Sequence, residues 1–133
     1  MGAGAGARLF RVILPVADID RAQAFYEAVL AAAGERVSPG RHYIACGGVI
    51  LALVDPRAEG DGYDARPNQD FVYFAVDDLE AAHALVRSAG ARRVDAGVAA
   101  TPWGERLFYA HDPFGNPICF VDSSTAFTGG LPD

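Results

Sequence analysis

The fold of this 133-residue chain can be inferred from residues 12–25, VILPVADIDRAQAF, because a similar stretch, VYFAVDDLEAAHAL, stands at residues 72–85. The offset between the copies is 60 residues (72 − 12), and identical residues stand at 12/72, 16/76, 18/78, 22/82 and 24/84. Each copy runs from an apolar segment through an aspartate into residues with helical spacing. A repeated unit of this size indicates two similar modules. We expect a ligand-binding cleft where the modules meet.

The first module, residues 8–55, is predicted to have the order β-α-β-β-β. A strand over 8–16 leads to Asp18, which is a good N-cap for a helix over 19–33. Turn-forming glycines and a proline then separate three further strands, at 35–38, 42–46 and 49–54.

The second module, residues 70–122, is predicted to repeat this order. A linker over 56–69, rich in Pro, Gly, Asp and Arg, precedes it. Its strand over 70–76 leads to Asp78, which caps a helix ending near residue 89. The remaining strands are predicted at 91–96, 105–110 and 117–122. The two modules form one domain over 8–122, and we interpret 1–7 and 123–133 as tails.

Composition excludes several classes of partner. The net charge is −6 and the sequence pI is about 4.9. Arg92-Arg93 is the only adjacent basic pair, which is too little for the basic stripe of a nucleic-acid binder. No apolar stretch approaches the roughly 20 residues of a membrane span, and residues 1–7 lack the pattern of a signal peptide. We therefore expect a cytoplasmic protein that binds neither nucleic acid nor membranes.

Strand alternation places Arg11, Ile13 and Pro15 on one face of the first strand. The helix is expected to pack on the opposite face. In the repeat, Arg11 corresponds to Phe71 and Ile13 to Tyr73. The final strands of the modules can also be matched, and Ala52 then corresponds to Cys119.

Three motifs resemble the vicinal oxygen chelate superfamily, which includes glyoxalase I, bleomycin- and fosfomycin-resistance proteins and extradiol dioxygenases. They are VADIDRAQAFY at 16–26, FAVDDL at 74–79 and DPFGNP at 112–117. The resemblance covers residues 8–122. It implies an α+β fold in which two tandem βαβββ modules form a curved mixed sheet around a cleft, and it implies a homodimer.

The resemblance also implies where a divalent metal would be held, in members that need one. The ligands come from the first and last strands of each module, at positions that correspond to Arg11, Ala52, Phe71 and Cys119. Arginine is always cationic, and alanine and phenylalanine offer no donor. One cysteine does not make a site, because catalytic zinc uses about three protein ligands. We expect neither a metal nor another cofactor.

The remaining candidates are ligand-binding side chains. Arg11 is interpreted either as a strand-end arginine in solvent or as a cleft cation that binds an anion or stacks on Phe71 or Tyr73. His42 begins a strand and could reach the cleft mouth. Trp103 is expected at a pocket rim, and Phe108 is preferred to its neighbour Tyr109 as the cleft-facing aromatic. The complete candidate set is Arg11, Ile13, His42, Ala52, Phe71, Tyr73, Trp103, Phe108 and Cys119.

These observations favour a glyoxalase/bleomycin-resistance-like protein that binds a small, partly aromatic molecule without the family's metal. No nucleophile motif such as G-x-S-x-G is present, and no catalytic residue can be named. Two alternatives stay open. One is a lyase, isomerase or dioxygenase of this superfamily with an atypical site, and the other is a non-catalytic interaction dimer.

Overall fold

The computed structural model describes residues 6–129 and divides the chain into two compact units. The first unit extends to Glu27 and continues over Ala31–Arg66, and the second comprises Ala28–Leu30 and the chain from Pro67 onward. Within the described residues, no helix combines the length and the apolar character needed to span a membrane. The predicted tail residues 1–5 and 130–133 lie outside the described part.

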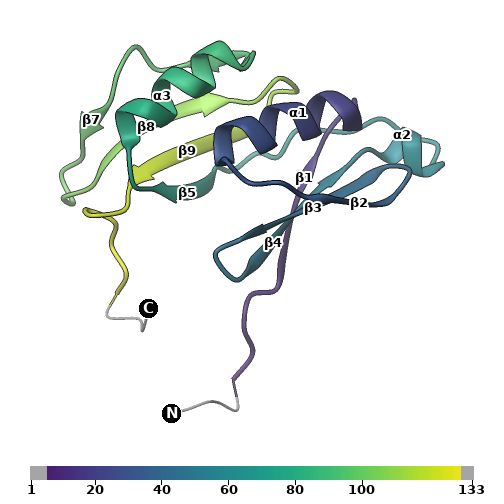
Figure 1. Cartoon of the computed structure of the whole chain (residues 1–133), viewed down its shortest axis with the longest axis horizontal. Coiled ribbons are helices and arrows are strands. Elements are labelled where there is room, and N and C mark those ends of the chain that lie inside the picture. The colour runs from purple at the N-terminus through teal and green to yellow at the C-terminus, as the bar shows by residue number, and fades with distance from the viewer. Residues whose placement is uncertain (1–5, 130–133) are drawn as a thin grey trace. The chain divides into compact units, whose positions relative to one another are not determined.

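The first unit has the predicted β-α-β-β-β order, followed by a short helix (Figure 1). Its sheet has the strand order β1-β4-β3-β2, in which β1 is parallel to β4 and the other neighbours are antiparallel. The sheet is therefore mixed, as expected. The elements are β1 (Arg11–Pro15), α1 (Ile19–Leu30), β2 (Glu35–Ser38), β3 (Arg41–Cys46), β4 (Val49–Val54) and α2 (Pro56–Glu59).

The ends of the helices follow local capping chemistry. Asp18 accepts the backbone N–H of Arg21 at 3.1 Å, so the predicted N-cap is confirmed. The helix ends at Leu30 rather than at residue 33, because Ala31 takes a left-handed conformation with φ 51°. The short helix α2 was not predicted. Asp55 caps it through the N–H of Ala58, and a proline occupies its first turn.

The second unit repeats the topology of the first. Its strand order is β5-β9-β8-β6, with β5 parallel to β9 and β8 antiparallel to both β9 and β6. The prediction that both segments share one strand order is confirmed. The elements are β5 (Val72–Val76), α3 (Leu79–Ser88), β6 (Arg93–Val94), β7 (Ala99–Ala100), β8 (Arg106–His111) and β9 (Pro117–Asp122).

The strand predicted at 91–96 is wrong in extent. Only Arg93–Val94 pairs with β8, and a second two-residue strand, β7, pairs with β8 further along. Asp95 explains the interruption, because its backbone N–H donates to the carbonyl of Tyr109 while its carboxylate accepts the Tyr109 N–H at 3.0 Å. The side chain of Asp95 thus replaces a backbone acceptor where the ladder would continue.

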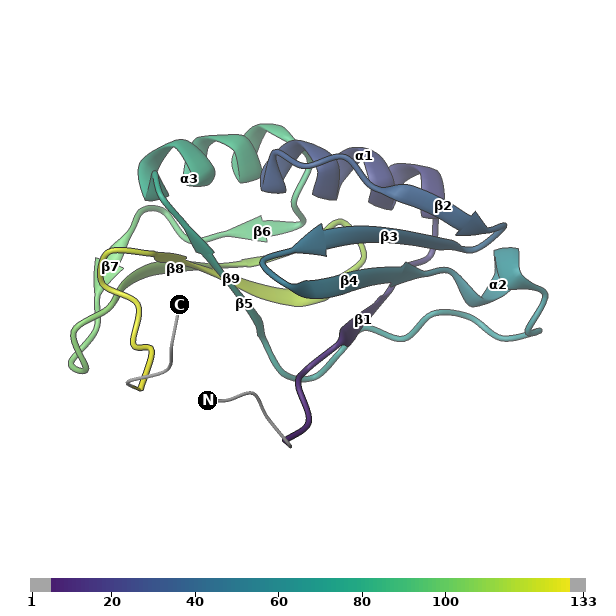
Figure 2. The same cartoon turned by 60° about the horizontal axis from the view of Figure 1, so that its bottom comes forward.

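The core of the second unit is a stack of three phenylalanines on the helix-facing side of the sheet. Phe120 lies between Phe74, at a centroid distance of 5.3 Å, and Phe108, at 5.2 Å. Figure 2 shows α3 covering this side of the sheet. Asp78 caps α3 by accepting the N–H of Ala81 at 3.0 Å, as predicted.

The DPFGNP motif forms the turn between β8 and β9. Asp112 and Asn116 are both fully buried. Asp112 accepts the backbone N–H groups of Phe114 and Asn116 at 2.8 Å, and the Asn116 amide donates to its other oxygen at 2.9 Å. Asn116 also accepts the N–H of Asn68 at 2.8 Å. The polar motif is therefore structural, because its buried groups satisfy one another.

Candidate functional site

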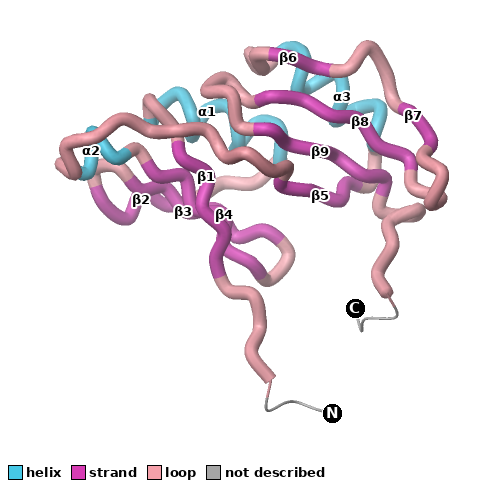
Figure 3. The backbone as a smooth tube through the Cα atoms, turned by 180° about the vertical axis from the view of Figure 1, so that it is seen from behind, coloured by secondary structure: helices cyan, strands magenta, loops and turns pink. Residues whose placement is uncertain are grey.

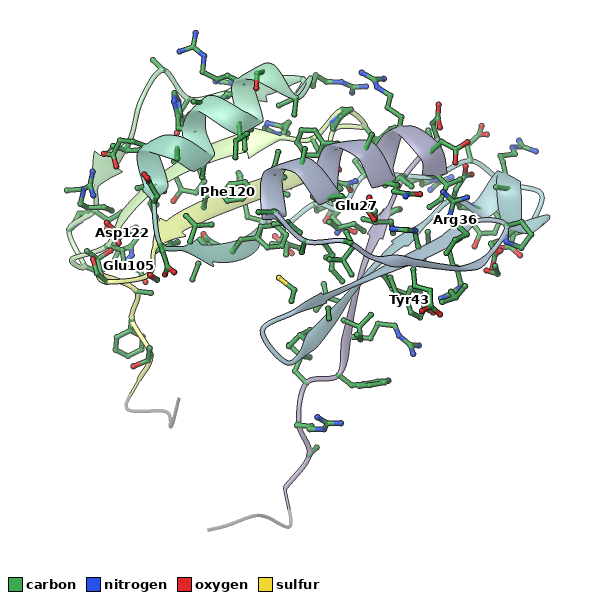
Figure 4. All side chains as sticks on the ribbon, viewed as in Figure 1. Glu27, Arg36, Tyr43, Glu105, Phe120 and Asp122 are labelled. Carbon is green, nitrogen blue, oxygen red and sulfur yellow. The ribbon has the colours of Figure 1, made fainter. Side chains whose placement is uncertain are left out.

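The side of the first sheet that faces away from α1 carries the residues predicted from strand alternation. Leu14 is buried, whereas Ile13 is 47% exposed. Strand register places Ile13, Ala52 and Tyr43 in one row across β1, β4 and β3. Figure 4 shows Glu27 between α1 and the strands and Tyr43 on the opposite side of β3. We call this opposite side the open face of the first sheet.

Arg11 lies at one end of this open face and contacts aromatic rings. Its guanidinium carbon is 4.9 Å from the ring centroid of Tyr43 and 5.0 Å from that of Phe10. These aromatic contacts come from its own unit, since Tyr43 lies one row from Arg11 on the same sheet face. Stacking of Arg11 on Phe71 or Tyr73, which belong to the second unit, stays a prediction. Cation–π contacts of this kind position an exposed arginine without a carboxylate.

A groove of about 680 Å³ occupies the other end of the open face. Its floor is a row of three residues on neighbouring strands. Val54 of β4 lies in the middle and pairs with Pro15 of β1 and with Arg41 of β3. Ile13 extends the apolar floor by one row. The opposite wall comes from the loop that leaves α2, which Figure 3 shows as a long segment without helix or strand. The residues lining this groove are Ile13, Pro15, Arg41, Val54, Pro56, Asp61, Tyr63, Asp64, Ala65 and Arg66.

Arg41 is held at the groove by two groups. Its Nη1 donates to the Tyr43 hydroxyl at 2.9 Å, and its Nε lies 3.3 Å from Glu59 Oε1. The hydrogen bond to Tyr43 raises the pKa of Arg41, and Glu59 adds to this effect. The N–H of Gly40 lowers the pKa of Glu59, as do Ser38 and Arg41. Both groups therefore keep their charges at neutral pH.

His42 does not reach a cleft mouth, which corrects the prediction made for it. It is 1% exposed, and its Nε2 lies 2.8 Å from Glu27 Oε2 of α1. Alternation on β3 explains this, because its neighbours Arg41 and Tyr43 take the open face. Glu27 also accepts the Gly34 N–H at 2.7 Å. This backbone bond and then His42 lower the pKa of Glu27.

The second sheet has a matching open face. Its central row is Tyr73, Cys119 and Tyr109, across β5, β9 and β8. This row has the pattern of Ile13, Ala52 and Tyr43, with a small residue on the central strand. Burial raises the pKa of Tyr109, with further contributions from Tyr73 and Cys119.

Phe108 lies on the helix side of this sheet, so its prediction as the cleft-facing aromatic is wrong. It is fully buried and meets His83 of α3 edge-on at 4.9 Å. The register pairs Phe108 with Phe120 and Tyr109 with Cys119. Tyr109 therefore shares the open face with Phe71, whose ring centroid is 5.0 Å away. A smaller cavity of about 250 Å³ adjoins these rings, lined by Phe71, Arg93, Asp95, Tyr109, Ala110 and His111.

Trp103 is 62% exposed in the loop before β8. Its indole N–H donates to Glu105 at 2.8 Å, and the other oxygen of Glu105 accepts the backbone N–H of Phe127 at 2.8 Å. Figure 4 shows Glu105 beside the chain's C-terminal segment. Glu105 thus links this loop to the residues that follow β9. Trp103 lines neither the groove of the first unit nor the cavity beside Tyr109.

The resemblance implies metal ligands at two positions in each unit, and the side chains at these positions can be compared with what a metal requires. In the first unit they are Arg11, a cation, and Ala52, which has no donor atom. In the second they are Phe71 and Cys119. Burial raises the pKa of Cys119 to about 12, and Glu105 and Asp95 contribute. The free thiol is therefore protonated near neutral pH, and one cysteine does not supply the three or four ligands of a metal site. Within residues 6–129, no group of three or more His, Cys, Asp or Glu side chains could hold a metal ion.

The sequence reasoning missed Tyr43, Arg41 and the loop residues Tyr63 and Arg66. Tyr43 and Tyr109 pair across strands with the matched positions Ala52 and Cys119, a correspondence that the strand register shows and the sequence alone does not. The sequence offers no signal for Tyr63 and Arg66 either, because a segment rich in Pro, Gly and charged residues has no periodicity from which its contacts can be predicted.

Comparison with known proteins identifies the family. The model of the Glyoxalase/Bleomycin resistance protein/Dioxygenase superfamily matches residues 8–120. The chain belongs to this superfamily. No curated protein sequence matches it significantly.

Solved structures show the same fold. A glyoxalase/bleomycin resistance protein from Albidiferax ferrireducens T118 has a TM-score of 0.71 and 21% identity, covering 84% of this chain and 94% of that one. A lactoylglutathione lyase from Agrobacterium tumefaciens has a TM-score of 0.66 and 22% identity, covering 88% and 94%. A glyoxalase/bleomycin resistance protein/dioxygenase family enzyme from Burkholderia phytofirmans PsJN has a TM-score of 0.72 and 19% identity, covering 86% and 98%. At these identities the likeness concerns the fold, which hosts several chemistries.

Proposed function

We propose that this protein binds a small, partly aromatic molecule without the divalent metal used by enzymes of its superfamily. The groove on the open face of the first sheet carries this proposal. Its volume of about 680 Å³ lies within the range of small-molecule sites. An apolar floor beside a few polar groups is the usual composition of such sites.

The donor set supports the metal-independent part of the proposal. Arg11 and Ala52 leave the first unit without a ligand at either family position, and Phe71 leaves the second with Cys119 alone. A single protonated thiol does not replace the three or four ligands of a typical metal site. Binding would instead rest on apolar contact, ring stacking and charged hydrogen bonds.

Small aromatic probes should bind in the presence of excess EDTA. We would titrate ¹⁵N-labelled protein with benzoate, naphthoate and their neutral amides, and follow the backbone amide resonances. Shifts confined to residues on the open faces, unchanged by EDTA, are expected because apolar contact and charged hydrogen bonds need no metal. Binding that begins only after a divalent cation is added would refute the proposal, as would the lack of any saturable shift.

We also propose that the protein is a homodimer. Several large apolar side chains are exposed on the described surface, including Leu9 at 67%, Phe10 at 52% and Tyr73 at 56%. A second copy of the chain would cover such surfaces, which soluble monomers seldom leave uncovered.

A further inference from the structure

The four charged side chains that line the groove of the first unit differ in how they are paired. Arg41 lies 3.3 Å from Glu59, and Asp64 lies 2.8 Å from Arg57. Arg57 also lowers the pKa of Asp64. Among residues 6–129, no ion pair or side-chain hydrogen bond engages Arg66. The groove therefore contains one cation with no charge partner of its own.

The apolar side chains of the groove are also partly exposed to solvent. Ile13 is 47% exposed on the floor, and Tyr63 is 59% exposed on the wall. Pro15 and Val54 complete the floor, and strand pairing holds them side by side. Covering these side chains would remove apolar surface from water, which is the main favourable term in burying an uncharged ring.

We propose that this groove binds a flat, apolar molecule that carries a carboxylate, with the carboxylate on Arg66 and the flat part between Tyr63 and the floor. This proposal rests on the proposed function and names its ligand class. A guanidinium holds a carboxylate through two parallel N–H···O bonds, which fixes the ligand's orientation. Arg41 lies in the same lining, but its charge is balanced by Glu59, so the anion site is assigned to Arg66 alone.

The acidic lining residues define which charge the ligand carries. Asp64 is neutralised by Arg57, so it offers little to a cationic ligand. Asp61 has no ion partner among the described residues, and it would repel a carboxylate placed beside it. The carboxylate must therefore lie toward Arg66. A cationic ligand would be repelled by Arg66, the one arginine of the lining that no carboxylate balances among the described residues.

The test compares naphthoate with its neutral isostere naphthamide, using the backbone amide resonances of Ile13, Val54 and Ala65 as local reporters. We expect naphthoate to shift these resonances saturably and to bind at least about tenfold more tightly than naphthamide, which lacks the charged contact. Arg66→Gln should weaken naphthoate by about tenfold or more and leave naphthamide unchanged. This substitution should not disturb folding, because Arg66 is exposed and has no partner to lose among the described residues.

Arg87→Gln is the matched control. It removes the same charge from an exposed position on α3, in the other unit. It should leave both affinities unchanged, so a loss common to the two variants would indicate a general effect of net charge and overturn the proposal. Naphthamide binding as tightly as naphthoate would overturn it as well.

The residues whose amide resonances shift show whether this proposal or the proposed function on which it rests has failed. If both probes shift only residues of the second unit, such as Tyr109, the groove is wrong while metal-independent binding stands. If neither probe shifts any described residue, both the groove and the proposed function are refuted.

Discussion

Phe120→Ala is expected to cost about 3–5 kcal/mol of folding free energy, because it empties the centre of the phenylalanine stack. Phe120 is fully buried, with its ring between Phe74 and Phe108 at centroid distances of 5.3 and 5.2 Å. Removing the ring leaves a cavity and ends both ring contacts. A loss of this size is a large share of the roughly 5–15 kcal/mol that stabilises a typical domain.

Urea unfolding followed by far-UV circular dichroism measures this loss. Tyr73→Ala on the neighbouring strand β5 is the control, because Tyr73 is 56% exposed and its truncation should cost less than about 1 kcal/mol. Phe120→Leu keeps most of the volume and serves if the alanine variant does not fold, with an expected loss below that of alanine. Equal stability of the Phe120→Ala and Tyr73→Ala variants would contradict the assigned core.

Gly34→Ala is expected to destabilise the first unit by about 2–3 kcal/mol, because the position has no room for a methyl group. A Cβ there would lie 2.5 Å from the carbonyl oxygen of Tyr43 and 2.7 Å from Nε2 of His42. The nearest obstacle is backbone, which cannot rotate away. Movement of Gly34 would also weaken its N–H bond to Glu27, the largest cause of that residue's lowered pKa.

The pH dependence distinguishes the lost bond from simple crowding. A carboxylate with a lowered pKa stabilises the fold above its ordinary value of 4.5, and this contribution disappears as pH falls through the folded-state pKa. The difference in unfolding free energy between wild type and Gly34→Ala should therefore narrow as the pH falls below 4.5.

Gly97→Ala supplies the control for this series, since a Cβ there would meet nothing within 4 Å. Its stability should match that of wild type within about 0.5 kcal/mol. A Gly34→Ala protein as stable as the Gly97→Ala protein would show that the packing of Gly34 against β3 is wrong.

The fold could be predicted because its signals are local and repeated. Asp18 and Asp78 stand at the same place in the two copies, and each caps its helix as predicted. Alternation on β1 correctly separated buried Leu14 from exposed Ile13. The misplaced elements, the short β6 and β7, depend on the side chain of Asp95, whose partner Tyr109 is distant in sequence.

The candidate site residues were harder to predict, because the sheet face that each side chain occupies depends on how neighbouring strands are paired. Alternation along β8 shows that Phe108 and Tyr109 lie on opposite faces, but it does not show which of them shares a face with Cys119. The pairing of β8 with β9 shows that Tyr109 does. The prediction that His42 reaches the cleft mouth was wrong for the same reason, because His42 lies on the helix-facing side of β3 and pairs with Glu27 of α1. The loop residues Tyr63 and Arg66 join the groove through tertiary structure alone.

Metal content tests the central claim most directly. Untagged protein would be incubated separately with Zn²⁺, Ni²⁺, Mn²⁺ and Fe²⁺, desalted, and analysed by inductively coupled plasma mass spectrometry. The positions at which the resemblance implies metal ligands hold Arg11, Ala52, Phe71 and Cys119, which do not form an adequate donor set. The bound metal should therefore stay well below one equivalent per chain for every ion. Retention of about one equivalent of any ion, removable by EDTA with loss of probe binding, would contradict the metal-independent function.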